Sequence, residues 1–219
     1  MKIALLLSGQ VREIEKSFPA IKKCIITPTD CDIFARVCKD EHTESLYPFL
    51  TEKDCVGWEV EEDFLIDSVR FPFTGSDKNN RMQRYYQQLY GIYKVNEQRK
   101  KHDVLYDLVI RCRLDLKPVT CLSSLWALGK NTLYTPICNS YGGLNDQFAI
   151  GSPEVIDVYA NRFNIIKNTK TIDNNSEQQL YRIIREHNID IKLVSFNYDL
   201  VGKDVGSKVK EAQNYKEGR

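Results

Sequence analysis

The sequence predicts an α/β protein whose main domain holds a mixed, mainly parallel β-sheet flanked by helices. Residues 2–37 run from an apolar strand through an amphipathic helix to a second strand, which is the order of a βαβ unit. Such units are nearly always right-handed and bring their two strands side by side in parallel. Residues 106–116 begin with an uninterrupted apolar run, as expected of a strand covered on both faces. The 219 residues are enough to bury the core of one large domain.

The net charge of +1 gives no general electrostatic reason to expect nucleic acid or an anionic membrane as a partner. No apolar segment approaches the roughly 20 residues needed to cross a bilayer. The apolar run in residues 1–9 is too short for a signal peptide and ends in a turn. We therefore expect a cytoplasmic protein with no membrane span and no nucleic-acid partner.

Seven cysteines occur in a chain that shows no export signal. An odd number of cysteines in such a chain favours reduced thiols over a disulfide framework. Zinc sites usually pair cysteines two to four residues apart, and no C-x-x-C motif is present, which argues against structural zinc.

In the first third of the chain, a buried strand is expected over residues 2–7, followed by a turn at 8–10. Apolar residues at helical spacing predict a helix over 11–25. Pro19 lies inside that helix and is expected to kink or restart it. The second strand is expected over 32–37.

The middle of the chain predicts a short helix over 46–50, a short strand over 56–60 and a loop over 71–80. Residues 81–101 form the best-patterned helix, with apolar and tyrosine side chains along one stripe. A tyrosine stripe at this spacing favours a core face over a ligand-stacking face.

Two later helices have well-marked starts. Ser152 is an N-cap followed by proline at the first helical position, which predicts a helix through residue 163. A capping-box pattern at Ser176 predicts a second helix to about residue 187. Strands are expected over 132–137 and 189–196.

The last residues, 202–219, are polar and rich in lysine, so we expect a tail or a linker to further domains of a longer enzyme. Residues 1–201 then make up the folded domain. Within it, residues 138–147 read as a polar loop that leads into the apolar run 148–151.

The central strand points to a ligand site. Because side chains alternate along a strand, Arg111, Arg113 and Asp115 share one face, with neighbours ~6.5 Å apart. All three could touch one ligand of the size of a diphosphate, at the strand end where open α/β sheets bind ligands. The alternative is a solvated salt-bridge ladder on a half-exposed strand.

Several familiar sites are absent from the sequence: it has no G-x-G-x-x-G fingerprint, no P-loop and no G-x-S-x-G elbow. The histidines lie in polar surroundings without ligand spacing. Short polar segments at expected strand ends remain, around Ser8, Asp32, Asp115 and Asn145. A carboxylate beside arginines suits Mg²⁺ or Mn²⁺ holding a diphosphate. Gln87 and Gln88 are weaker ligand candidates.

Residues 2–12, 106–116 and 145–149 together resemble a group of glycosyltransferases of the GT-A fold, which occur in bacterial surface-polysaccharide clusters and in large algal viruses. The resemblance covers most of residues 1–200. It implies a single-domain, GT-A-like fold with a Rossmann-like nucleotide-binding sheet. It also implies a hexosyl- or deoxyhexosyltransferase that moves a sugar from a nucleotide-diphosphate donor, foremost a UDP-sugar, to a glycan acceptor. Such an enzyme would build polysaccharide or glycoprotein glycans in the cytoplasm, which for a viral protein is the host cytoplasm.

The resemblance further implies a Mn²⁺ or Mg²⁺ ion held by the aspartate motif after the central strand, here Asp115. Arg113 stands where the first aspartate of the usual D-x-D motif is found. Either Arg113 takes over part of the charge role of the metal, or other carboxylates complete the coordination shell.

By the same resemblance, Asp146 is expected to bind sugar hydroxyls or to deprotonate the acceptor. Glu177 is the rival catalytic base, although an acidic residue is also favoured by the helix dipole in a first turn. Asp32 is expected to face the nucleotide base or ribose, or else to cap a loop. The residues expected to bind the donor are Ser8, Gly9, Gln10, Arg12, Asp32, Arg111, Arg113, Asn145 and Gln147.

Two other readings compete with glycosyl transfer. A nucleotidyltransferase would use the same metal and diphosphate chemistry on a similar sheet. A non-catalytic module that binds saccharide or docks a partner domain would fit the missing first aspartate and the linker-like end of the chain.

Overall fold

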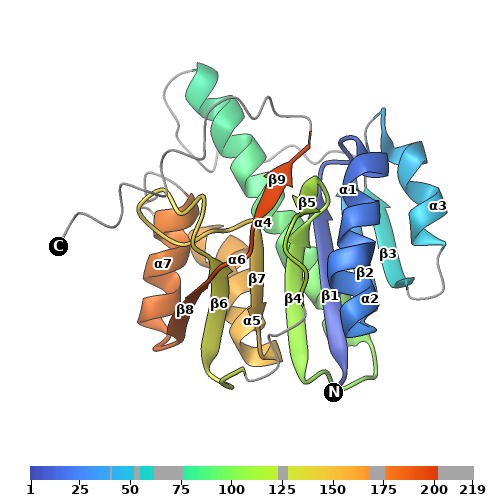
Figure 1. Cartoon of the computed structure of the whole chain (residues 1–219). Helices are drawn as coiled ribbons and strands as arrows, with labels where there is room; N and C mark the ends of the chain where they lie inside the picture. Colours follow the sequence, from blue (N-terminus) through green and yellow to red (C-terminus); the bar gives the residue numbers. More distant parts are fainter. Residues whose placement is uncertain (40, 52–54, 62–75, 123–127, 168–175, 202–219) are drawn as a thin grey trace.

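A computed structural model shows a central β-sheet with helices packed on both of its faces (Figure 1). It describes the whole chain except residues 40, 52–54, 62–75, 123–127, 168–175 and 202–219. The predicted tail over 202–219 and the first part of the predicted loop over 71–80 therefore lie outside the described residues.

The sheet has seven strands in the order β3-β2-β1-β4-β7-β6-β8. Strand β7 runs antiparallel to both neighbours, and every other neighbouring pair is parallel. This confirms the predicted mixed, mainly parallel sheet. The strands are β1 Ile3–Gly9, β2 Asp32–Cys38, β3 Cys55–Glu61, β4 Leu108–Arg113, β6 Thr132–Pro136, β7 Phe148–Gly151 and β8 Asp190–Val194. A separate antiparallel pair consists of β5 Leu116–Pro118 and β9 Tyr198–Leu200.

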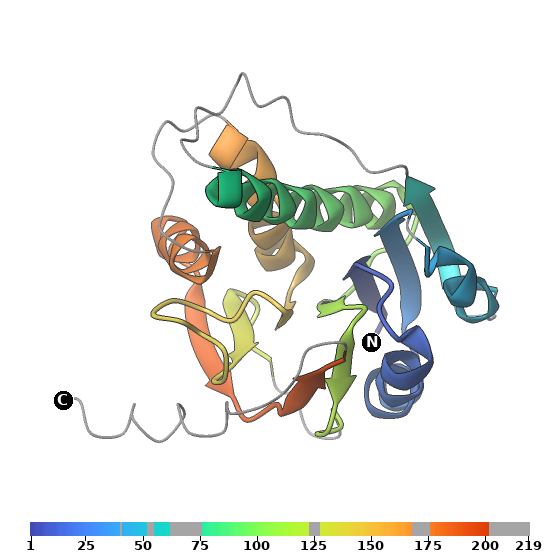
Figure 2. The ribbon, with the colours of Figure 1, turned by 90° about the horizontal axis from the view of Figure 1, so that it is seen from above.

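Helices cover the two faces of the sheet, as Figure 2 shows from above. One face packs against α1 Ile14–Ile21 and its irregular continuation, the π-helix Lys22–Ile26 and α2 Thr27–Thr29. Near it lie the 3₁₀ turn Thr43–Leu46 and α3 Tyr47–Leu50. The helices on the opposite face are α4 Ser76–Lys101, α5 Pro153–Ala160, α6 Arg162–Lys167 and α7 Ser176–Glu186. Within the described part of the chain, no helix combines the length and apolar character that crossing a membrane requires.

Strand β1 shows why the amino-terminal sequence is apolar throughout. Its residues alternate between two separate cores: Leu5 and Leu7 pack on the α1 side, while Ala4 and Leu6 pack on the α4 side. All four side chains are fully buried. A strand covered on both faces needs an uninterrupted apolar run, since neither face meets water.

Three predicted elements differ from the structure. The predicted loop is wrong for residues 76–80, because α4 already begins at Ser76 and the long helix outweighs the turn preference of its asparagines. The central strand ends at Arg113, and residues 114–115 turn before β5. Past Pro19 the helix becomes irregular, as predicted, but it does so through the π-helical turn Lys22–Ile26.

The expectation that all cysteines are reduced is wrong for one pair. Cys24 and Cys121 form a disulfide, with their Cα atoms 4.0 Å apart. The backbone N–H of Leu122 donates to the carbonyl of Cys24 (3.0 Å), which shows how closely the two segments run. The partners are 97 residues apart in the sequence, so no local spacing could reveal the contact.

The predicted start of α5 is confirmed and can be tested. The Ser152 hydroxyl accepts from the backbone N–H of Val155 (3.4 Å). Replacing Ser152 by alanine leaves that N–H unpaired, so we expect a loss of about 1 kcal/mol in unfolding free energy. In a thermal melt this corresponds to a Tm lower by roughly 2–4 °C. Ser195→Ala, at an exposed serine, is the matched control and should leave Tm unchanged. Equal Tm values for both variants would contradict the cap.

Candidate active site at the carboxyl ends of the parallel strands

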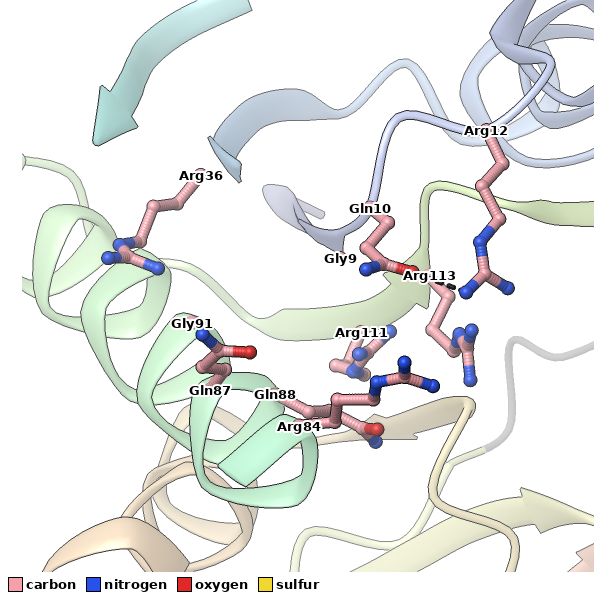
Figure 3. A pocket seen from close by; sticks show the side chains of 10 residues that line it. All are labelled: Gly9, Gln10, Arg12, Arg36, Arg84, Gln87, Gln88, Gly91, Arg111 and Arg113. Atoms are coloured by element: carbon pink, nitrogen blue, oxygen red, sulfur yellow. Dashed lines mark hydrogen bonds between the residues drawn. The ribbon is translucent and has the colours of Figure 1, made fainter. Parts of the chain in front are cut away.

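A pocket of about 150 Å³ opens where β1, β2 and β4 end beneath α4 (Figure 3). Among the described residues, the lining consists only of arginines, glutamines and glycines, so it carries strong positive charge and no carboxylate. These residues are Gly9, Gln10, Arg12, Arg36, Arg84, Gln87, Gln88, Gly91, Arg111 and Arg113.

The sheet register explains why the arginines meet. Ser8 of β1 is paired with Arg36 on β2 and with Arg113 on β4, and Leu6 is paired with Arg111. Paired residues of neighbouring strands point to the same face, here the face covered by α4. That face is apolar towards the amino ends of the strands and turns into a row of guanidiniums towards the carboxyl ends.

Arg111 is the most deeply buried of these cations, with an exposed fraction of 0%. Its Nη1 donates to the carbonyl of Gln147 (3.0 Å) and its Nη2 to the Ser8 hydroxyl (3.4 Å). Its Nε has no hydrogen-bond partner among the residues that the structure describes. Burial lowers the pKa of the Arg111 guanidinium, which reflects the cost of holding the charge away from water. The groups that Arg111 bonds are both neutral, so an anion entering the pocket would complete its environment.

Arg36 is held by a carboxylate and an aromatic ring. It is 1% exposed, forms an ion pair with Glu61, and lies over the Tyr90 ring at 4.6 Å from the centroid. Gly91 lets α4 approach this guanidinium closely, since a Cβ at that position would lie 3.4 Å from Arg36 Nη1. Glycine inside a helix costs about 1 kcal/mol relative to alanine.

Asp115 lies behind the pocket rather than in it. Its Oδ1 accepts from Arg113 Nε (2.8 Å), and its Oδ2 accepts from Arg113 Nη2 (2.6 Å) and Arg12 Nη1 (3.4 Å). The carboxylate is 1% exposed. Burial alone would lower the pKa of Arg113, but the charge of Asp115 raises it. Asp115 therefore fixes two guanidiniums that line the pocket.

This geometry does not fit the predicted metal role of Asp115. Both of its carboxylate oxygens are engaged by guanidinium N–H groups, whereas a Mn²⁺ or Mg²⁺ ion needs carboxylate oxygens as ligands. Across the described ranges, no group of three or more histidine, cysteine or acidic side chains is arranged to hold a metal ion.

A second polar cluster adjoins the pocket through Gln88. Asp146 is 3% exposed, and its Oδ2 accepts from Gln88 Nε2 (2.9 Å) and from the Ser176 hydroxyl (2.6 Å). The Tyr159 hydroxyl donates to the backbone carbonyl of Asp146 (2.7 Å). Glu177 follows Ser176 in the first turn of α7. The two predicted catalytic carboxylates therefore lie in one region, and Gln88 joins that region to the pocket.

Electrostatics distinguish the Glu177 carboxyl from an ordinary surface acid. Burial, and then the negative charge of Asp146, raises the pKa of the Glu177 carboxyl. The positive charge of Arg162 opposes the shift, but more weakly. Arg162 is itself fully buried over the Tyr159 ring, 4.4 Å from the centroid, and neither of its Nη atoms has a hydrogen-bond partner in the described part of the chain.

Other residues predicted to bind the donor serve the scaffold. The Asn145 side chain is fully buried and bonds the Cys138 carbonyl, the Tyr198 hydroxyl and the backbone N–H of Gln147. The Gln147 side chain accepts from the Tyr198 hydroxyl (2.9 Å). Ser8 contributes its hydroxyl to Arg111. Gly9, Gln10, Arg12, Arg111 and Arg113 line the pocket itself, as do Gln87 and Gln88.

Asp32 is not brought to the pocket. It begins β2, whose other end carries Arg36, and its carboxylate bonds the Tyr106 hydroxyl (2.8 Å) and Lys2 (3.5 Å). Arg36, Arg84 and Gly91 were not predicted from the sequence. Arg36 had a recognisable signal, because it interrupts the apolar run that follows Asp32 in β2, while Arg84 resembles any polar residue of a long helix.

The sheet order, with a pocket at the carboxyl ends of its parallel strands, defines an α/β protein with the GT-A glycosyltransferase fold. The structure is similar to the apo form of glycosyltransferase GlyE from Streptococcus pneumoniae TIGR4. The TM-score is 0.54 at 12% identity, covering 88% of this chain and 45% of that chain. It is also similar to the galactosyltransferase LgtC in complex with donor and acceptor sugar analogs. That TM-score is 0.51 at 12% identity, covering 86% of this chain and 72% of that chain.

The chain belongs to the family described as Domain of unknown function (DUF7796), whose model matches residues 1–203. No curated protein matches the sequence. The chain spans 45% of GlyE, which is less than half of that protein. The likeness to GlyE and LgtC confirms the predicted GT-A fold, while the resemblance to enzymes of algal viruses stays a prediction.

The raised pKa of Glu177 predicts a pH-dependent stability. Because the folded protein holds this proton more tightly than the unfolded chain, ionisation as the pH rises above the ordinary value of 4.5 lowers stability. Glu177→Gln removes the cost of ionising this buried carboxyl. Its Tm should therefore exceed that of the parent at pH 7, and the difference in Tm should narrow towards pH 4. Thermal melts from pH 4 to pH 7 test this prediction, and Glu44→Gln, at an exposed glutamate, is the control. A gap that does not change with pH would contradict the assignment.

Proposed function

We propose that this protein is a glycosyltransferase that moves a sugar from a nucleotide-diphosphate donor, a UDP-sugar, to a glycan acceptor. The observation that carries the proposal is the row of guanidiniums at the carboxyl ends of β1, β2 and β4, within a GT-A fold. Open α/β sheets bind their ligands at this edge. The printed names of GlyE and LgtC, both glycosyltransferases, support the same class of activity.

The diphosphate of the donor is assigned to the pocket. Arg111 and Arg113 project from β4 and Arg84 from α4, so the group would be held from two sides. Guanidinium N–H groups match phosphate oxygens in geometry and can bind two of them at once. When the bond from the sugar to the diphosphate breaks, negative charge develops on the departing diphosphate. Prearranged cations around that position stabilise the charge and lower the barrier.

The acceptor is assigned to the region of Asp146 and Glu177. A base that removes the acceptor proton must come within about 3 Å of the hydroxyl. A carboxyl whose pKa is raised, as burial and Asp146 raise that of Glu177, is a stronger base than an ordinary one. Glu177 is therefore the proposed base, and Asp146, with Gln88, orients the hydroxyls of the sugars. The expected Mn²⁺ or Mg²⁺ ion is not part of this proposal, because Asp115 is engaged by arginines.

The activity can be tested by incubating the protein with a panel of nucleotide sugars and following the products. We expect release of a nucleoside diphosphate, slowly by hydrolysis without acceptor and faster when saccharide acceptors are added. Release of pyrophosphate from nucleoside triphosphates would instead indicate nucleotidyl transfer. Binding of saccharide without any binding of nucleotide would indicate a non-catalytic module.

The arginine pocket makes a separate prediction. Arg84 lines the pocket but is exposed on α4, so Arg84→Gln should fold normally. Loss of one charged hydrogen bond to phosphate is expected to weaken nucleoside-diphosphate binding roughly tenfold. Calorimetry with UDP measures the change, and Arg185→Gln, at an exposed arginine of α7, should bind as the parent does. If both variants weaken UDP binding equally, the effect comes from the overall charge of the protein, and the pocket is not the nucleotide-binding site.

A further inference from the structure

We propose that the donor diphosphate is neutralised by guanidiniums without a divalent metal ion, and that Asp115 is a positioning residue for Arg113 and Arg12. This inference rests on the proposed function and concerns the same pocket. It reverses the role that the D-x-D resemblance implies for Asp115.

The first support is the saturation of the Asp115 carboxylate. Arg113 donates two parallel hydrogen bonds to it, from Nε to Oδ1 at 2.8 Å and from Nη2 to Oδ2 at 2.6 Å. A bidentate pair of this kind fixes the plane of the guanidinium as well as its position. A third hydrogen bond comes from Arg12 at 3.4 Å. A metal ion could bind Asp115 only after displacing Arg113, because the carboxylate is almost wholly shielded from solvent.

The second support is the charge of the surroundings. Five arginines line the pocket, and within the described ranges the carboxylates that pair with them are Asp115, behind Arg113 and Arg12, and Glu61, beside Arg36. An excess of positive charge therefore faces the cavity. Like charges at short range repel strongly where water is excluded, so a divalent cation placed among these guanidiniums would be opposed. A diphosphate would be attracted by the same field.

The third support is that the chemistry is complete without a metal. The bond between the anomeric carbon of the sugar and the diphosphate oxygen breaks, and its electron pair stays on that oxygen. The acceptor oxygen forms the new bond to the anomeric carbon, and its proton passes to the base, assigned to Glu177. The guanidiniums keep their protons throughout and act through charge and hydrogen bonds. Neither an oxidant nor a further reactant is needed.

The decisive experiment measures binding of UDP, GDP and ADP by calorimetry in two buffers, one with EDTA and one with MnCl₂. We expect at least one of them to bind with dissociation constants that agree within about twofold between the buffers. Binding that falls more than about tenfold in EDTA would overturn the inference while leaving the proposed function standing. Failure of all three to bind in either buffer would overturn the proposed function, and the inference with it.

Variants of Asp115 separate positioning from metal ligation. Asp115→Asn should weaken binding of the same nucleotide roughly tenfold, and equally in both buffers, because Arg113 loses its charged partner. In an Arg113→Gln background the same change should cost clearly less than tenfold, since of the two arginines that Asp115 positions only Arg12, at 3.4 Å, remains. Arg113→Lys, which keeps the charge but loses the bidentate geometry, should fall between the parent and Arg113→Gln.

A thermal melt of each variant establishes that it is folded, and Asp199→Asn, at an exposed position of β9, is the matched control. An effect of Asp115→Asn that appears with MnCl₂ and vanishes in EDTA would identify Asp115 as a metal ligand and overturn the inference. Full additivity of the Asp115 and Arg113 changes would overturn the positioning role, because a merely structural residue would not lose its effect when Arg113 is removed.

Discussion

The burial of the Arg36 and Arg111 guanidiniums, with the partly buried Arg113 beside them at the ends of neighbouring strands, is the constraint around which this edge of the protein is arranged. A charged side chain held away from water costs several kcal/mol unless partners replace the lost hydration. Arg36 receives Glu61 and the Tyr90 ring, Arg113 receives Asp115, and Arg111 receives two neutral oxygens. Among the described residues, Arg36 and Arg111 each keep a buried Nε without a hydrogen-bond partner. Of the three arginines, Arg111 is the one whose described partners include no carboxylate, and a bound anion in the cavity that it lines can take that place.

The antiparallel strand β7 supplies part of this compensation. It pairs with β4, and the residues just before it, 145–147, lie against the end of β4. The Gln147 carbonyl accepts both from the Arg111 guanidinium and from the backbone N–H of Arg113 (3.2 Å). Asn145 and Tyr198 hold this segment through buried hydrogen bonds, which keeps Asp146 directed towards Gln88 on α4. The cation pocket and the acidic cluster are therefore positioned by one short segment.

Periodicity in the sequence predicted the fold class and, of the pocket, Arg111 and Arg113, because strands buried on both faces leave an apolar pattern that is hard to imitate. The same periodicity failed at Asp115: alternation holds only while a strand continues, and β4 ends at Arg113. Asp32 and Arg36 show the complementary limit. Both belong to β2, which runs parallel to β1 as predicted, so its carboxyl end with Arg36 meets the pocket while Asp32 lies at the other end. The pairing of Cys24 with Cys121 was unpredictable for a related reason, since it depends on tertiary contact alone.

Arginine at position 113, in place of the first aspartate of the D-x-D pattern, changes the role that we assign to Asp115. With two aspartates, both carboxylates would face a cation from outside the chain. With arginine at 113, a cation is already part of the chain, and Asp115 is its nearest acceptor at 2.6 Å. Asp115 then stabilises the folded protein, because without it the partly buried charge of Arg113 would have too few partners. Arg113 and Asp115 are thus better understood as an ion pair than as an incomplete metal site, and in the proposed function the charge of Asp115 acts on the donor diphosphate through Arg113.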